Sequence, residues 1–307
     1  MNTPFSEFEK MPAQLKTLHL TEKQMKDIEK SLWVVTEKAH GANFSFVYEN
    51  RTLQFAKRKA YLNWGDDFFG FQLVVEKWEE KILAFFEQLS REIPAEKYLL
   101  YGELIGGAYP HNAVKAVEKI QAIQTGVYYC PDIQFFAFDI ALENVGEKRY
   151  LDYEIALSYF EQHQFLHAKP LFVGKFTACM AFPTRINSTI PQMLSLPPLE
   201  HNTIEGIVIK LYQNSQEIAY QPRIILKIKN DEFAEKSFHQ AEKWSYLPEV
   251  RSKSEELAFI LEEMRKYVSQ NRLQNVLSDI SHAIYKKCYF HNEFIINTLS
   301  YCYLIFV

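Results

Sequence analysis

The distribution of glycine constrains the fold more than any other feature of this chain. All ten glycines lie at or before position 206, and none follows. Tight turns and β-bulges usually need glycine, so a glycine-free tail favours a helical module over a second β-rich domain. We therefore expect two domains, one built on sheets over residues 1–236 and a helical one over residues 237–307.

Strand-like runs rich in β-branched and aromatic residues alternate with the glycines. They cover residues 33–37, 42–48, 98–105, 133–140, 206–211 and 223–229. Apolar residues at helical spacing between Leu73 and Leu89 predict one long helix among them. This pattern predicts an α+β domain of mainly antiparallel sheets with helices on their faces.

The last part of the chain has a different periodicity. Two amphipathic faces, one between Leu257 and Val268 and one between Leu273 and Ile284, predict helices. The longest uncharged stretch, residues 294–307, is shorter than the roughly 20 residues that a membrane span needs. No apolar run of signal-peptide length occupies the first thirty residues, so we expect a soluble, intracellular protein, cytoplasmic by default, without a membrane partner.

Charge and cysteine content exclude several classes of protein. The chain has 34 Lys and Arg against 38 Asp and Glu, which argues against coating of nucleic acid by bulk charge. Any phosphate chemistry must therefore be local. The four cysteines are scattered without a C-x-x-C pair, which predicts reduced, buried thiols rather than a disulfide framework or a zinc site.

Charged residues recur inside or beside the apolar strands. Lys38 follows the first strand and lies three residues before Gly41, a short motif that by itself also fits a solvated lysine before a turn. Further charges stand in the segments 101–107, 135–140, 204–210 and 226–229. An unpaired charge in an apolar strand costs free energy, so these groups predict one shared polar pocket. Lys227 and Lys229 project to the same face of a strand and could present two positive charges to a phosphate.

The order and spacing of these five segments resemble the covalent nucleotidyltransferases. Within them, Lys38-x-His40-Gly41-x-Asn43, with Arg58 twenty residues after Lys38, resembles the RNA ligase 2 family, which includes phage RNA ligases and kinetoplastid RNA-editing ligases. The resemblance runs from about residue 33 to residue 236. It implies an ATP-grasp-like nucleotidyltransferase domain followed by a small all-α domain, and an ATP-dependent RNA ligase activity.

The resemblance also implies roles for individual residues. Lys38 would be the nucleophile that takes AMP from ATP, His40 would matter for sealing, and Lys227 and Lys229 would bind the α-phosphate. The implied ATP- and AMP-binding set is Glu37, Lys38, Asn43, Arg58, Glu103, Phe138, Val208, Lys227 and Lys229. Within it, Glu37 would help to recognise adenine, while Phe138 and Val208 would pack on its two faces.

Two carboxylates and one arginine complete the implied site. Asp139 and Glu205 would place a divalent metal, Mg²⁺ or Mn²⁺, and Arg272 in the helical tail would contact RNA. The metal would neutralise the charge that develops on pyrophosphate. A lysine attacks phosphorus only as the neutral amine, a form that neighbouring ammonium groups favour.

The implied substrate is RNA with 5′-phosphate and 3′-hydroxyl ends, with nicks in duplex RNA as the expected form, and the enzyme is expected to be a monomer. Two alternatives remain open at this point. One is a DNA ligase or a capping guanylyltransferase that lacks its β-barrel, and the glycine-free tail speaks against both. The other is a nucleic-acid-binding protein that keeps the nucleotide pocket but does not ligate.

Overall fold

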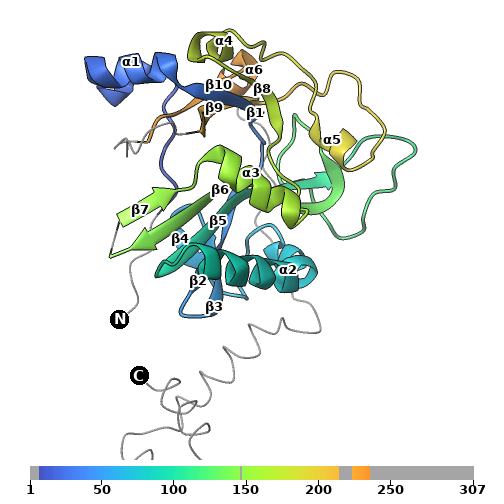
Figure 1. Ribbon diagram of the computed structural model, residues 1–307. Coiled ribbons are helices and arrows are strands. Elements are labelled where there is room, and N and C mark those ends of the chain that lie inside the picture. Colours follow the sequence, from blue (N-terminus) through green and yellow to red (C-terminus); the bar gives the residue numbers. More distant parts are fainter. Residues whose placement is uncertain (1–6, 146, 214–222, 236–307) are drawn as a thin grey trace, which may run out of the picture. The chain divides into compact units, whose positions relative to one another are not determined.

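The computed structural model describes residues 7–145, 147–213 and 223–235 (Figure 1). The chain divides into two units, Met1–Ser252 and Lys253–Val307, and the second lies wholly outside the described residues. The predicted helical domain over residues 237–307, including Arg272, lies outside them as well. All of the described helices and strands belong to the first unit.

A four-stranded antiparallel sheet carries the first strand and the last two. Its order is β10-β9-β1-β8, formed by β10 (Ile225–Lys229), β9 (Gly206–Gln213), β1 (Leu32–Glu37) and β8 (Pro170–Gly174). Helices α1 (Glu22–Lys30) and α4 (Phe176–Met180) contribute to its apolar core. The Trp33 ring packs against Phe176, and its Nε1 donates to the carbonyl of Ile28 over 2.9 Å. This sheet holds together segments that are far apart in the sequence.

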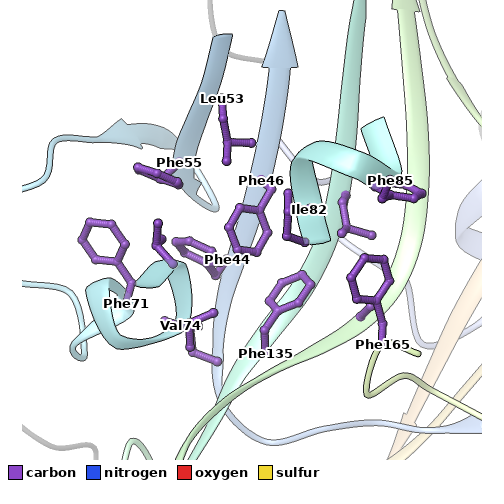
Figure 2. Close-up of a cluster of buried hydrophobic side chains, with 14 of the residues drawn as sticks. Phe44, Phe46, Leu53, Phe55, Phe71, Val74, Ile82, Phe85, Phe135 and Phe165 are labelled. Carbon is purple, nitrogen blue, oxygen red and sulfur yellow. The ribbon is translucent and has the colours of Figure 1, made fainter. Parts of the chain in front are cut away.

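A second, six-stranded antiparallel sheet has the order β4-β3-β2-β5-β6-β7. Its strands are β4 (Ala60–Leu62), β3 (Thr52–Lys57), β2 (Ala42–Glu49), β5 (Lys97–Ala108), β6 (Cys130–Asn144) and β7 (Glu147–Tyr150). Helix α2 (Phe71–Glu92) covers one face of it. Figure 2 shows Val74, Ile82 and Phe85 of α2 pointing toward Phe44 and Phe46 of β2, all of them buried. These buried aromatic and aliphatic side chains hold α2 against one face of the six-stranded sheet. The opposite face is left for contacts with other parts of the chain.

Shorter helices complete the described part of the chain. They are η1 (Leu15–Leu18), α3 (Tyr153–Gln162), α5 (Ile190–Met193) and α6 (Asp231–Glu235). Helix α3 contacts β6 of the six-stranded sheet and β9 of the four-stranded sheet. It therefore ties the two sheets together. Among the described residues, no helix is long and apolar enough to cross a membrane.

The structure confirms the predicted α+β class and most of the predicted elements. All six predicted strands form, and the helix predicted between Leu73 and Leu89 extends to Phe71–Glu92. Strands β3, β4, β7 and β8 were not predicted. Cys130 and Cys179 are buried free thiols, as expected, whereas Cys288 and Cys302 lie outside the described residues.

Candidate active site

A cavity of about 200 Å³ takes its walls from both sheets. All nine residues that we predict to bind the nucleotide line it: Glu37, Lys38, Asn43, Arg58, Glu103, Phe138, Val208, Lys227 and Lys229. They come from the ends of β1 and β2, from β5, β6, β9 and β10, and, for Arg58, from the turn between β3 and β4. The single polar pocket predicted from charges on strands is thus present.

Lys38 owes its position to the pairing of β1 with β9. Glu37 pairs with Ile207 in this antiparallel ladder, and the backbone N–H of Lys38 donates to the carbonyl of Gly206 over 3.0 Å. Glu205 precedes β9, so its carboxylate lies beside the lysine. The distance from Lys38 Nζ to Glu205 Oε2 is 2.6 Å. Residues 167 positions apart are brought together by the register of two strands.

Glu205 gathers three basic groups. Besides Lys38, Lys229 Nζ lies 2.6 Å from its Oε1, and His40 Nδ1 lies 3.4 Å from its Oε2. Burial alone would raise the pKa of Glu205, but the hydrogen bond from His40 and the charge of Lys38 lower it to about 2. Glu205 is therefore ionised at any physiological pH and faces Lys38.

Lys227 adds a further positive charge to the wall of the cavity. Burial lowers the pKa of Lys227, and the nearby charges of Lys229 and Lys38 lower it further. Lys227 and Lys229 both line the cavity, as their two-residue spacing on a strand predicts. Clustered ammonium groups of this kind are suited to a phosphate.

Asn43 and Glu103 face each other across the ladder between β2 and β5. Burial raises the pKa of Glu103 to about 7, although the charge of Lys38 opposes the shift. Asn43 Oδ1 is buried and accepts no hydrogen bond from the residues that the structure describes. A buried acceptor without a donor costs free energy, so its presence in the cavity wall fits a ligand that carries a hydroxyl or amino donor.

Phe138 and Val208 line the cavity from different sheets, β6 and β9. The N-terminal segment also contributes, because Phe8 and Met11 line the cavity and the buried Phe8 ring packs edge-on against Phe138 at 5.2 Å. The carbonyl of Pro12 accepts a hydrogen bond from the backbone N–H of Lys227 over 3.0 Å. Sequence reasoning missed this segment, since two phenylalanines in a short polar stretch give no periodic signal.

The side chain of Glu37 is occupied by the turn before α5. Ser188 Oγ donates to its Oε1 over 2.6 Å, and the backbone N–H and hydroxyl of Thr189 donate to its Oε2 over 2.8 and 2.9 Å. Burial raises the pKa of Glu37, and these hydrogen bonds oppose the shift. Recognition of adenine by this side chain stays a prediction, and it would require a ligand to share these oxygens.

Asp139 is likewise occupied, in its case by two cations. Lys210 Nζ lies 2.9 Å from its Oδ1, and Arg223 binds it in a bidentate manner at 2.9 and 2.7 Å. Burial acts to raise the pKa of Asp139, but Arg223 and Lys210 outweigh it and hold the pKa below its usual range. In the described part of the chain, no three His, Cys, Asp or Glu side chains form a cluster that could hold a metal ion.

His40 and Gly41 connect the lysine to β5 and β6. The backbone N–H of His40 donates to the hydroxyl of the buried Tyr129 over 2.8 Å. The His40 ring packs edge-on against Phe233. A Cβ on Gly41 would lie 2.1 Å from the carbonyl oxygen of Leu104, so only glycine allows the loop to approach β5 this closely. This is the physical reason for a glycine three residues after the lysine.

The cavity lies between two antiparallel sheets and contains a lysine that is ion-paired with a carboxylate, two more lysines and an aromatic residue. This arrangement is that of a nucleotidyltransferase site. The model of the RNA ligase family matches residues 31–229, which include every residue of this cavity except Phe8 and Met11. The chain therefore belongs to the RNA ligase family of nucleotidyltransferases.

The sequence identity to individual relatives is low. The chain is 28% identical over 298 residues to the mitochondrial RNA-editing ligase 2 of Trypanosoma brucei brucei (strain 927/4 GUTat10.1), covering 83% of this chain and 71% of that protein. It is 28% identical over 237 residues to the mitochondrial RNA-editing ligase 1 of Trypanosoma brucei brucei, covering 66% of this chain and 50% of that protein. Among solved structures, it is similar to a mutant Naegleria gruberi RNA ligase with ATP and Mn, with a TM-score of 0.46 and 18% identity over 76% of this chain and 59% of that one.

Proposed function

We propose that this chain is an ATP-dependent RNA ligase that joins 5′-phosphate and 3′-hydroxyl ends, with nicks in duplex RNA as its substrate. The contact between Lys38 and Glu205, in a cavity with Lys227 and Lys229, is the observation that carries the proposal. A nucleophilic lysine needs this combination, because the phosphate must be neutralised where the amine attacks. Membership of the RNA ligase family supports the same activity.

In the first step, Lys38 Nζ attacks the α-phosphorus of ATP. A P–N bond forms, the bond from the α-phosphorus to the bridging oxygen breaks, pyrophosphate leaves, and the amine loses a proton. Lys227 and Lys229 neutralise the α-phosphate during this displacement. When bound, a divalent cation would neutralise the leaving pyrophosphate, and Glu205 is the residue that would hold it. One protein carboxylate together with substrate phosphates is a common set of ligands for Mg²⁺.

The rest of the cavity suits the nucleoside. Phe138 offers an aromatic face for the base, a contact worth about 1–3 kcal/mol, and Val208 supplies an apolar wall. Asn43 Oδ1 and Glu103 would accept hydrogen bonds from ribose hydroxyls, a role that the pairing of these two residues supports, as does Asn43 Oδ1, which has no partner among the described residues. Arg58, exposed at the mouth of the cavity, would contact the sugar-phosphate region.

Two further displacements complete the cycle. The RNA 5′-phosphate attacks the lysyl-AMP phosphorus and releases Lys38, and the adjacent 3′-hydroxyl then attacks the RNA phosphate and releases AMP. Each is an in-line displacement at phosphorus that needs the same cationic surroundings, so one cavity can serve all three. His40 would act in the later steps, because it contacts Glu205 on the side of the reacting lysine.

The domain organisation and cellular setting are part of the same proposal. Residues 1–236 would form the adenylyltransferase domain, and residues 237–307 a helical domain that docks RNA through Arg272. We also propose a monomeric, intracellular enzyme. Light scattering during size-exclusion chromatography tests the oligomeric state, and removal of residues 237–307 should abolish sealing while lysine adenylylation persists.

The decisive experiment is incubation of the purified chain with α-labelled ATP or GTP, followed by nicked RNA or nicked DNA. We expect a covalent AMP adduct that is lost in Lys38→Ala and retained in Lys30→Ala, a matched change at an exposed lysine of α1. Label should then transfer to nicked RNA. A GMP adduct would indicate a capping enzyme, sealing of DNA alone a DNA ligase, and absence of any adduct a binding protein.

A further inference from the structure

Most of the hydrogen-bonding capacity of the Asp139 carboxylate is occupied. Its two carboxylate oxygens accept three hydrogen bonds, one from Lys210 and two from the guanidinium of Arg223. The Asp139 side chain is 2% exposed and that of Lys210 is 4% exposed. Bidentate contact by an arginine uses the carboxylate lone pairs that a metal ion would need. A divalent cation at this carboxylate would also lie beside two positive charges, of which Lys210 is buried and Arg223 is partly exposed.

The three residues join the two sheets. Asp139 belongs to β6 of the six-stranded sheet, Lys210 belongs to β9 of the four-stranded sheet, and Arg223 lies two residues before β10. Buried ion pairs with several hydrogen bonds are rigid, because every alternative geometry leaves a charge without a partner. Asp139, Lys210 and Arg223, which we call the Asp139 clamp, therefore hold together the two sheets that form the nucleotide cavity.

The Asp139 clamp also fixes the aromatic wall of the cavity. Lys210 Nζ donates to the carbonyl of Phe138 over 2.6 Å, so the cation that pairs with Asp139 also holds the backbone of the residue expected to contact the base. Aromatic rings flank both cations: Arg223 lies 3.8 Å from the centre of the Tyr150 ring, and Lys210 lies 4.8 Å from that of Tyr153. Asp139 and Lys210 also line the nucleotide cavity, and the backbone position of Phe138 depends on them.

We propose that Asp139, with Lys210 and Arg223, is a positioning residue that holds Phe138 in the base-binding wall, and that it is not a metal ligand. This inference rests on the proposed nucleotide-binding function of the cavity. It departs from the role that family resemblance assigns to Asp139, and it leaves Glu205 as the predicted metal ligand. The two roles differ in a measurable way, because a positioning residue matters for ATP binding even when metal is absent.

The test measures ATP binding in EDTA by calorimetry. Asp139→Asn should weaken metal-free ATP binding by at least about tenfold, because Lys210 and Arg223 lose their anionic partner and release Phe138. The double variant Asp139→Asn with Arg223→Gln should recover part of this loss, since it removes one of the two uncompensated charges. Removal of a cation should restore ATP binding if Asp139 neutralises Lys210 and Arg223. It should not restore ATP binding if Asp139 is a metal ligand.

A milder variant guards against misfolding of Asp139→Asn. Arg223→Lys keeps the charge but loses the bidentate contact, and should weaken metal-free ATP binding about threefold while circular dichroism stays native. The inference is overturned if Asp139→Asn, or Arg223→Lys where the first does not fold, binds ATP like the wild type in EDTA. A rise in the half-saturating Mn²⁺ concentration for Asp139→Asn, similar to that of Glu205→Gln, would also overturn it.

Failure of this inference is distinct from failure of the proposed function. Wild-type chain that forms lysyl-AMP and seals nicked RNA establishes the function, whatever the Asp139 variants do. A wild-type chain that binds ATP in EDTA, but forms no adduct when Mg²⁺ or Mn²⁺ is present, would refute the ligase activity. The role of the Asp139 clamp in ATP binding could still be measured.

Discussion

Two buried carboxylates in this protein are each surrounded by cations, and the surroundings differ in how closed they are. The cations at Glu205 are partly accessible: the side chains of Lys38 and Lys229 are 17% and 35% exposed. At Asp139, Lys210 is 4% exposed, and Arg223, which is 23% exposed, makes two hydrogen bonds to the carboxylate. Both carboxylates are 2% exposed, so the difference lies in their partners: Glu205 contacts separate lysines, whereas Asp139 contacts a buried lysine and a bidentate arginine.

The elements involved explain this difference. Glu205 directly precedes β9, Lys38 directly follows β1, and Lys229 ends β10. Strands β1 and β10 flank β9, so the Glu205 cluster lies at one end of a single sheet. The Asp139 clamp joins two sheets. A cluster at the strand ends of one sheet can rearrange when a ligand enters, whereas rearrangement of the Asp139 clamp would separate the two sheets.

The largest effect that separates the two carboxylates is expected in the chemical step. Glu205→Ala should lower the rate of lysyl-AMP formation at saturating ATP by roughly 10³-fold, because it removes the only predicted metal ligand that faces the reacting lysine. Asp139→Asn should stay within about tenfold of wild type under the same conditions, since its loss lies in ATP binding. Single-turnover kinetics with labelled ATP measure both. Equal rates for the two variants would remove the distinction.

A smaller effect should follow from the lysines around Glu205. Lys227→Ala should slow lysine adenylylation by about 10²-fold, because one of the groups that neutralise the α-phosphate is lost. Single-turnover adenylylation measures this loss, with the exposed Lys23→Ala of α1 as the matched control. If Lys227→Ala reacts as fast as Lys23→Ala, the accessible cluster at Glu205 does not bind phosphate.

Stability should depend on pH through Glu103. Its pKa is 4.5 in the unfolded chain and about 7 in the fold, so the unfolded chain releases this proton first as pH rises. Stability therefore falls between about pH 4.5 and 7, and Glu103→Gln should remove about 1–3 kcal/mol of that fall. Urea unfolding at pH 5 and pH 7.5 measures it, with the exposed Glu76→Gln as control. An unchanged fall in Glu103→Gln would refute the assignment.

The opposite sign is expected for Glu205. Its pKa is about 2 in the fold, below its ordinary value of 4.5, so it stabilises the protein above about pH 4.5. That contribution is lost as pH falls toward 2. Glu205→Gln should therefore flatten the loss of stability in a urea series extended from pH 5 toward pH 2, and a loss as steep as that of wild type would contradict the pairing with Lys38 and Lys229.

The smallest effect is expected at the N-terminal segment. Phe8→Ala should weaken ATP binding by about two- to tenfold, because Phe138 loses an edge-on aromatic neighbour. Fluorescence titration with ATP measures it, with Phe172→Ala on the exposed strand β8 as control. Equal affinities for the two variants would show that this segment plays no part in binding.

Much of this architecture could be predicted from sequence, because the signals were local. Alternation and glycine turns located the six predicted strands, and helical spacing located α2. Strands β4 and β7 are short, and β8 lies at a sheet edge with largely exposed side chains, so none gives a clear period-two pattern. Charges on apolar strands correctly indicated one pocket.

The partners of the predicted site residues could not be found in this way. Lys210 and Arg223 lie 71 and 84 positions from Asp139, and Ser188 lies 151 positions from Glu37. These contacts depend on how the two sheets pack, which no local pattern records. Phe8 and Met11 were missed for the same reason. The signal that was available for Asp139 is the buried lysine in its neighbouring motif, since an acid and a base on apolar strands satisfy each other most simply.

The pairing of β1 with β9 has a consequence for synthesis and folding. The nucleophile and its carboxylate are 167 positions apart, and their approach depends on a ladder between an early and a late strand. Contacts of such high sequence separation form slowly, because a long loop must close first. A ribosome that has not yet released residue 229 carries a chain that includes Lys38 but lacks a complete nucleotide cavity, so the growing polypeptide cannot consume ATP until the sheet domain is almost fully made.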